Sequence, residues 1–126
     1  MPELNKIIDA DFKKKLGDRW EIFQVLHKLI LSLNKKVNFR IFPIYITYHL
    51  KDKNIALIYY KGKFVNDGGL DIGLNLKGNP TSNKFIKAEY MHYPGITHST
   101  KIKKLRDIDL NLIKVIKSII LTQKET

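Results

Sequence analysis

The residues in this sequence best suited to chemistry are tyrosines and lysines that accompany alternating aliphatic segments. Successive side chains of a β-strand point to opposite faces, so tyrosines in such segments can reach an exposed or partly covered face and stack there on bases. The candidate stacking residues are Tyr45, Tyr59 and Tyr60. Two groups of basic residues would attract phosphates: Lys51, Lys53, Lys61 and Lys63 in the first, and Lys101, Lys103, Lys104 and Arg106 in the second. This combination predicts a site for an anionic ligand such as nucleic acid or polyphosphate.

The same residues also have a structural explanation. Tyrosine is favoured in strands because its ring packs well on a pleated, half-buried surface. Lysine at turns and sheet edges prevents one sheet from pairing with another. Both explanations fit the spacing.

Three side chains of types that bind divalent metals form a second candidate site: Glu89, His92 and His98. A metal-dependent hydrolase would need them to converge, with further ligands held by supporting residues. His98 also has a structural interpretation, because it follows Gly95 at the entrance to a predicted strand, where its ring can hydrogen-bond the backbone of a turn. The sequence therefore ranks metal chemistry last, and it predicts no cofactor.

Two acidic patterns suggest nuclease chemistry only weakly. Asp11 and Lys13 match half of a signature in which a carboxylate binds Mg²⁺ and a lysine polarises the attacking water, but that pair belongs on a strand and here lies in a helical pattern. Asp67 and Asp71 flank two glycines, and no acidic-x-lysine tripeptide follows on the next strand. The two glycines also lack the helix start that a phosphate cradle needs.

The chain is strongly basic, which bears on its partners. Its 126 residues include 23 Lys and Arg against 12 Asp and Glu, for a formal net charge of +11. Such an excess raises a positive field that attracts polyanions. Only three of the basic residues are arginine, and this preference for lysine also resembles the amino-acid usage of an AT-rich genome. The absence of cysteine excludes disulfides, cysteine nucleophiles and thiolate zinc sites.

Length and hydropathy predict one domain over residues 1–126, with its core at about 18–121. No apolar run approaches the roughly twenty residues that span a bilayer. The first residues lack the long apolar segment of a signal peptide. We therefore expect a cytoplasmic protein with no membrane partner.

Helical periodicity predicts three helices that would support these sites. The first covers residues 3–16. The second begins where Asp18 and Glu21 are spaced as a capping box, and the third occupies the C-terminal part, where Asp107 or Asp109 can cap its start. The apolar stripe of the second helix comprises Trp20, Phe23, Leu26, Ile30 and Leu33.

The predicted strands are residues 37–42, 44–50, 55–60, 64–77 with an interruption, and 97–103. Their connections are too short for crossover helices, so neighbouring strands should pair antiparallel. Residues 70–77 alternate apolar and polar, which predicts that one face is buried and the other meets water. Residues 81–93 are predicted to form a loop. The fold class is therefore α+β, with helices covering a five-stranded, mainly antiparallel sheet in two layers.

Residues 38–48, 55–61, 70–76 and 95–98, followed by Asp107 and a helix, carry a family resemblance. Over about Trp20 to Leu121 the chain resembles a small family of uncharacterised bacterial and archaeal domains, sometimes labelled predicted transport proteins. Members occur alone or attached to larger proteins, some near restriction and modification enzymes. The resemblance implies helices over an antiparallel sheet, distantly similar to frataxin-like and YdhG-like small domains, and it brings no established activity. The sequence departs from the family pattern where residues 79–93 are longer and less acidic and residues 97–104 are rich in lysine.

The sequence as a whole predicts a non-catalytic binding module for an anionic ligand, with nucleic acid or another polyphosphate as the leading candidate. The alternative is an accessory protein that docks on a protein partner through a sheet edge or forms a homodimer. A metal-dependent hydrolase ranks third.

Overall fold

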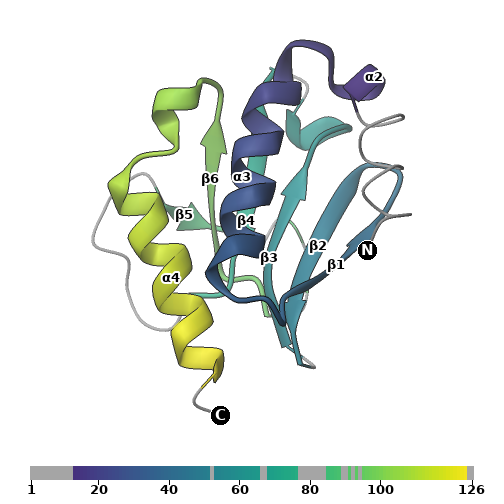
Figure 1. The fold of residues 1–126 in the computed structure, drawn as a ribbon. Helices are drawn as coiled ribbons and strands as arrows, with labels where there is room; N and C mark the ends of the chain where they lie inside the picture. The colour runs from purple at the N-terminus through teal and green to yellow at the C-terminus, as the bar shows by residue number, and fades with distance from the viewer. Residues whose placement is uncertain are drawn as a thin grey trace.

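Two helices, α3 and α4, lie over one face of a six-stranded antiparallel sheet (Figure 1). The structure, a computed structural model, describes residues 13–51, 53–65, 68–76, 85–88, 91, 93 and 95–124. The helical elements are α2 (Lys13–Leu16), the 3₁₀ turn η2 (Gly17–Arg19), α3 (Trp20–Leu33), the 3₁₀ turns η3 (Lys63–Val65) and η5 (Leu105–Asp107), and α4 (Leu110–Lys124). The strands are β1 (Asn38–Ile41), β2 (Tyr45–Leu50), β3 (Lys53–Tyr59), β4 (Leu70–Leu74), β5 (Ile86–Lys87) and β6 (His98–Ile102).

The strand order is β1-β2-β3-β4-β6-β5, and every pair is antiparallel. The predicted α+β fold with an antiparallel sheet is confirmed. The sheet has six strands rather than five, because β5 lies within the segment predicted to be a loop and pairs with β6 through Ile86 and Ser99. A strand of two residues is too short to show an alternating pattern. Within the described residues, no helix combines the length and the apolar character needed to cross a membrane.

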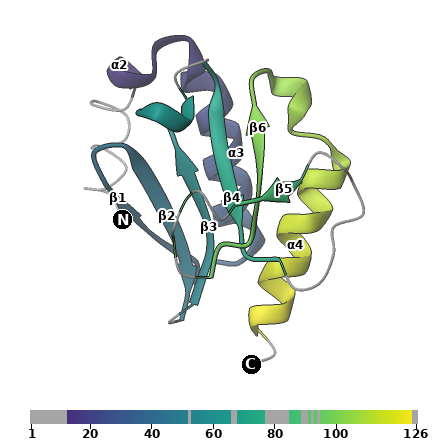
Figure 2. The same cartoon turned by 180° about the vertical axis from the view of Figure 1, so that it is seen from behind.

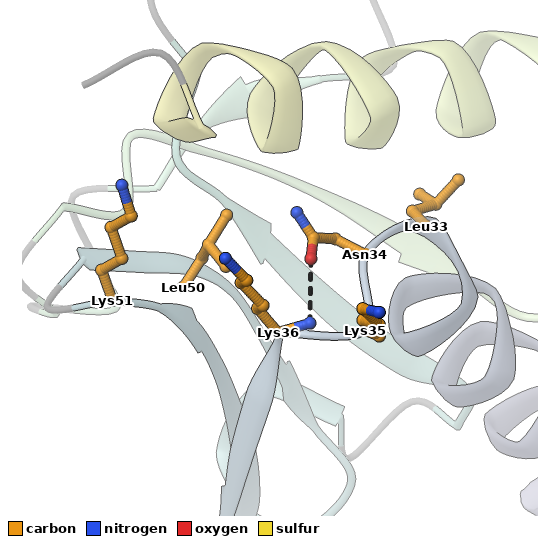
Figure 3. Close-up of a pocket in the computed structure, with 6 residues that line it drawn as sticks. All are labelled: Leu33, Asn34, Lys35, Lys36, Leu50 and Lys51. Carbon is orange, nitrogen blue, oxygen red and sulfur yellow. Dashed lines mark hydrogen bonds between the residues drawn. The ribbon is translucent and has the colours of Figure 1, made fainter.

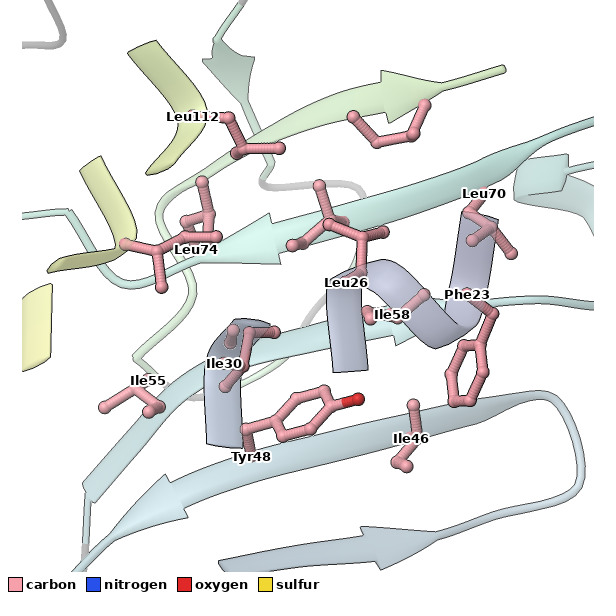
Figure 4. Packing of buried hydrophobic residues seen from close by; sticks show 14 of the residues in the cluster. Phe23, Leu26, Ile30, Ile46, Tyr48, Ile55, Ile58, Leu70, Leu74 and Leu112 are labelled. Carbon is pink, nitrogen blue, oxygen red and sulfur yellow. The ribbon is translucent and has the colours of Figure 1, made fainter. Parts of the chain in front are cut away.

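The helix-covered face of the sheet holds the larger core (Figure 4). Phe23, Leu26 and Ile30 of α3 are completely buried, as their spacing predicts. They pack over alternate residues of the central strands, including Ile46 of β2 and Ile58 of β3. Each such aliphatic side chain contributes roughly 1.5–3 kcal/mol when fully buried, so this face supplies most of the hydrophobic stabilisation.

The predicted capping box at the start of α3 is wrong. Asp18 lies inside the turn η2, and the residue that caps α3 is Arg19, whose side chain makes no capping hydrogen bond. Instead the Nη1 of Arg19 donates to the backbone oxygens of Tyr60, at 2.6 Å, and Gly69, at 3.0 Å. Gly17, which follows the last residue of α2, has a φ of +56°, the left-handed conformation in which glycine commonly ends a helix. Arg19 therefore ties the start of α3 to the ends of two strand segments.

The far face of β4 is also covered, contrary to the prediction that it meets water. Asp71 is only 1% exposed, and Gly73 beside it is buried. A second cluster lies on this face: Leu57, Tyr59, Val65, Ala88, Met91 and Ile96. Its last three members come from the described residues between β4 and β6, and they pack over this face of the sheet. The alternation of residues 70–74 therefore predicts the strand correctly. It does not predict that a second cluster of side chains packs against the other face of that strand.

Three further predictions concern segment ends. The start of the predicted strand 64–77 is wrong, because η3 is a 3₁₀ turn and β4 begins only at Leu70. The predicted cap of the C-terminal helix is confirmed at Asp109, whose Oδ1 accepts a hydrogen bond from the backbone nitrogen of Leu112 at 3.0 Å. Of the leading helix predicted for residues 3–16, only α2 falls within the described residues.

Candidate functional site

The first predicted group of lysines is divided between opposite ends of the sheet. Lys51 and Lys53 lie at the turn between β2 and β3, whereas Lys61 and Lys63 follow the other end of β3. Lys53 is the first of the seven residues of β3, and Lys61 follows the last, so the two pairs are separated by roughly 20 Å of strand. This group therefore does not converge on one ligand site.

The second predicted group lies at the same end of the sheet as the turn η3 (Figure 1). Its exposed members are Lys101, Lys103, Lys104 and Arg106. A carboxylate lies among them, because Oδ2 of Asp107 accepts hydrogen bonds from the backbone nitrogens of Lys103, at 2.9 Å, and Lys104, at 3.0 Å. That negative charge offsets part of the positive field of the group.

The three candidate tyrosines differ in accessibility. Tyr60 is 1% exposed and belongs to the helix-side core, where its hydroxyl donates to the backbone oxygen of Phe42. Tyr59 is 6% exposed and packs in the second cluster on the opposite face. Tyr45 is half-buried. Neither Tyr59 nor Tyr60 therefore presents a free ring for stacking, and Tyr45 is the candidate nearest to solvent.

A pocket of about 270 Å³ opens on the face of the sheet opposite α3 and α4. Figure 2 shows that face, with the sheet in front of α3. We call it the sheet-face pocket. Its lining residues are Arg40, Phe42, Thr47, His49, Lys51, Asn54 and Tyr93. Two permanent cations, an imidazole, a hydroxyl, an amide and two aromatic rings thus surround one opening.

Strand register explains why these side chains meet. Arg40 of β1 pairs with Thr47 of β2, so the two side chains lie together on one face. Alternation along β2 places His49 on that face as well. Between β2 and β3 the register shifts at Tyr48 and His49, so that His49 pairs with Asn54.

The register shift is a β-bulge, and it changes the chemistry of the pocket. Tyr48 pairs with Ala56 while the next residue, His49, pairs with Asn54, which leaves Ile55 as the extra residue of β3. Ile55 and Ala56 both belong to the helix-side core. In a regular ladder His49 would face Ile55. The bulge therefore puts a polar amide, rather than an aliphatic chain, beside the histidine.

His49 is a titratable group in the lining of the pocket. Burial lowers its pKa from the ordinary value of 6.5, and the nearby positive charge of Arg40 lowers it further. Its Nε2 is buried and has no hydrogen-bond partner among the described residues. The lowered pKa favours the neutral ring at pH 7, and Nε2 has a hydrogen-bonding capacity that no described residue uses.

Tyr45 does not line the pocket, but it packs against the two aromatic residues that do. Tyr45 stacks on Phe42 with ring centroids 4.7 Å apart, and it meets Tyr93 edge to face at 5.8 Å. Its other neighbour is Tyr59, at 5.1 Å. Tyr45 therefore acts as a support that fixes the two rings facing the pocket, each pair contributing about 0.5–1.5 kcal/mol beyond burial.

Most of these pocket residues do not appear among the sites predicted from sequence. Lys51 is shared, and Tyr45 is a supporting neighbour. A signal for Arg40, Thr47 and His49 was nevertheless present, because polar residues alternate with aliphatic ones along both strands. The contributions of Asn54 and Tyr93 depend on the bulge and on the packing of described residues between β4 and β6 over the sheet, and neither has a local sequence pattern.

The predicted metal site is only partly within the described residues. Glu89 and His92 lie outside them. His98 is half-buried at the start of β6, and its Nδ1 lies 2.9 Å from Oγ1 of Thr97, which is a side-chain contact and not the predicted hydrogen bond to the backbone of a turn. In the part of the chain that the structure describes, no group of three or more His, Cys, Asp or Glu side chains is placed to hold a metal ion.

The alternative of docking through a sheet edge concerns β1 and β5, the outer strands. They contain four and two residues, and Pro43 follows β1 in the sequence. Short edges present few backbone groups for pairing with another chain. The docking alternative stays a prediction.

In comparisons with known proteins, the chain matches no family model, no curated protein and no solved structure. The resemblance to the family of predicted transport proteins therefore stays a prediction.

Proposed function

We propose that this protein binds single-stranded nucleic acid through the sheet-face pocket, without catalysis. Arg40 and Lys51 hold a backbone phosphate, and a base stacks on Phe42 or Tyr93. The observation that carries the proposal is the convergence of these cations and aromatic rings on one opening.

Each side chain has a role suited to its chemistry. The guanidinium of Arg40 can bind two phosphate oxygens at once, and the ammonium of Lys51 adds a mobile positive charge. Thr47 and Asn54 supply a hydroxyl and an amide for hydrogen bonds to the base or the sugar. Stacking on an aromatic ring contributes about 1–3 kcal/mol per base and tolerates any sequence.

The local charge favours a phosphate ligand. Residues 33–54 include five Lys and Arg and one acidic residue, Asp52, which lies outside the described residues. A ligand made of phosphate alone would use these charges but would gain nothing from the rings. Bases joined to phosphates use both, which is why we propose nucleic acid rather than inorganic polyphosphate.

The test compares two single-arginine variants that change the charge equally. Arg40→Gln removes the guanidinium from the pocket, and Arg106→Gln removes one at the other end of the sheet. Binding of a fluorescent 12-nucleotide oligo(dT) is followed by anisotropy at low salt. We expect Arg40→Gln to weaken binding roughly tenfold or more, because a charge-assisted hydrogen bond contributes about 1.5–3 kcal/mol, and Arg106→Gln to have a much smaller effect.

Two results would contradict the proposal. One is no binding of the oligonucleotide by the unmodified protein at low salt. The other is an equal or larger loss in Arg106→Gln, which would move the site to the second basic group at the η5 end. Circular dichroism of both variants verifies that the fold is retained.

A further inference from the structure

A second, larger pocket adjoins the first at the turn between β2 and β3. Its volume is about 460 Å³, and it lies on the helix side, between the end of α3 and the end of β2 (Figure 3). We call it the lysine pocket. Its lining residues are Leu33, Asn34, Lys35, Lys36, Leu50 and Lys51. Lys51 thus lines both the lysine pocket and the sheet-face pocket.

The lysine pocket shares positive charge and an amide with the first pocket, but it has aliphatic side chains where the first has aromatic rings. It combines three ammonium groups with two aliphatic side chains, Leu33 and Leu50. Oδ1 of Asn34 accepts a hydrogen bond from the backbone nitrogen of Lys36 at 2.8 Å, which orients the amide so that Nδ2 can donate to a ligand (Figure 3). Such a pocket suits a phosphate with an attached sugar or base better than it suits a bare anion.

The end of α3 explains how lysines can gather here before any ligand binds. Lys35 and Lys36 follow its last residue, Leu33. The C-terminal end of a helix carries a partial negative charge, which favours nearby cations. The free protein can therefore keep these positive charges close together, ready for an anion.

Lys51 lies in the turn that joins β2 to β3. It has a φ of 58°, and it is the only described residue other than glycine with a positive φ. Tight turns between antiparallel strands require such a conformation. The turn therefore places Lys51 at the end of the sheet, where its side chain lines both pockets.

We infer that the two pockets are successive binding positions for one strand, which crosses the turn at Lys51. The inference rests on the proposed function and adds the length of the ligand to it. Arg40, Lys51 and Lys36 then form a path for consecutive phosphates from one side of the sheet to the other. The ligand is a strand of several nucleotides, and a mononucleotide or dinucleotide fills only part of the path.

The test follows each pocket separately by ¹⁵N NMR of the full chain. The dinucleotide dTpT should shift the amides of Thr47 and His49, whereas an octanucleotide, dT8, should in addition shift those of Asn34 and Lys36. The dT8 affinity should exceed that of dTpT by at least tenfold. Both ligands lack terminal phosphates, so that each nucleotide step adds one charge.

A pair of double variants provides the matched control. Lys35→Gln with Lys36→Gln removes two charges from the lysine pocket, and Lys103→Gln with Lys104→Gln removes two at the other end of the sheet. The first pair should weaken dT8 binding about tenfold, lower its salt slope by about 0.7 per lysine, and leave dTpT binding unchanged. The second pair should change dT8 binding much less.

The outcomes separate this inference from the proposed function. If dTpT and dT8 shift the same amides with the same affinity, and Arg40→Gln weakens both, the continuous path is wrong while the sheet-face pocket stands. If neither ligand shifts the amides of Thr47 and His49, the proposed function itself fails. If inorganic polyphosphate of equal charge binds as tightly as dT8, the assignment to a nucleic-acid strand is overturned.

Discussion

At the scale of single residues, His49 predicts how binding depends on pH. Its pKa in the free protein lies below 6.5, because burial and Arg40 both disfavour the imidazolium. A phosphate in the pocket favours the charged form, so binding is accompanied by proton uptake. We therefore expect the affinity for oligo(dT) without terminal phosphates to rise as the pH falls from 7 to 5.

The control for this prediction is His49→Asn, which keeps a polar side chain but does not titrate. Among the described residues, the other charged or titratable groups that line the pocket are Arg40 of β1, Lys51 after β2 and Tyr93. If the affinity of His49→Asn for oligo(dT) depends on pH as that of the unmodified protein does, the proton is taken up by another group.

A second histidine, His27 of α3, predicts how stability depends on pH. Its Nδ1 lies 2.8 Å from the hydroxyl of Tyr48, and burial and the nearby Lys28 lower its pKa to about 4. The unfolded chain, with a pKa of 6.5, binds a proton over an interval in which the folded protein does not. Stability is therefore complete above pH 6.5 and decreases as the pH falls to 4, by about 3 kcal/mol at most.

The variant that isolates this effect replaces both members of the pair, as His27→Phe with Tyr48→Phe. Replacing both partners by apolar groups of similar shape is nearly neutral, and aromatic rings already surround His27, including Phe23 and Phe39. Urea unfolding between pH 4 and 7 should show a smaller loss of stability for the double variant. Equal pH slopes in the two proteins would show that His27 is not responsible.

At the scale of elements, the sequence predicted what a local pattern can encode. The stripe of α3 and the alternation of β2 and β4 have periods that follow from the geometry of a single helix or strand, so periodicity is sufficient to find them. The sequence did not predict β5 or the cover over Asp71, because both depend on residues far apart in the chain, and it did not predict the bulge at Ile55, because alternation within one strand does not show how that strand is aligned with its neighbour. The sheet-face pocket depends on two of these features, which is why only Lys51 was identified as one of its residues.

The side chains that pack against the face of β4 opposite the helices predict the effect of replacing Gly73 by alanine. A Cβ added at Gly73 would lie 2.8 Å from Cγ2 of Ile96 and 2.9 Å from Sδ of Met91, which is too close for either contact. Gly73→Ala should therefore lower the free energy of unfolding by about 1–3 kcal/mol. Because Tyr93 belongs to the same segment, the variant should also weaken oligonucleotide binding.

A double-variant cycle checks the cause of this destabilisation. Ile96→Ala removes the nearer of the two colliding atoms, so Gly73→Ala should cost less in that background than in the unmodified protein. Urea unfolding of the four proteins gives the coupling free energy. Strictly additive effects would show that the contact with Ile96 is not the source of the loss.

At the scale of the whole molecule, the net charge of +11 predicts that salt and a bound polyanion each stabilise the folded protein, and that salt cancels the stabilisation by the polyanion. In the free protein the positive charges repel one another, so screening by added salt should raise the melting temperature. An oligonucleotide that binds only the folded protein also raises it, by an amount that depends on the ligand concentration relative to Kd. Salt weakens that binding and should therefore remove the second effect while it strengthens the first.

Thermal unfolding with and without a 12-nucleotide oligo(dT) can separate these effects. At a ligand concentration of about 100 times Kd, binding adds about 2.7 kcal/mol of stability, which corresponds to a rise of roughly 10 °C for a protein of this size. The rise should fall toward zero as salt increases from 20 to 300 mM, because binding releases counterions from the oligonucleotide and added salt makes that release less favourable. Polyglutamate of equal charge, which has neither phosphates nor bases, is the control and should stabilise the protein much less. Equal stabilisation by polyglutamate would mean that overall charge alone attracts the ligand, and that the aromatic rings of the sheet-face pocket take no part in binding.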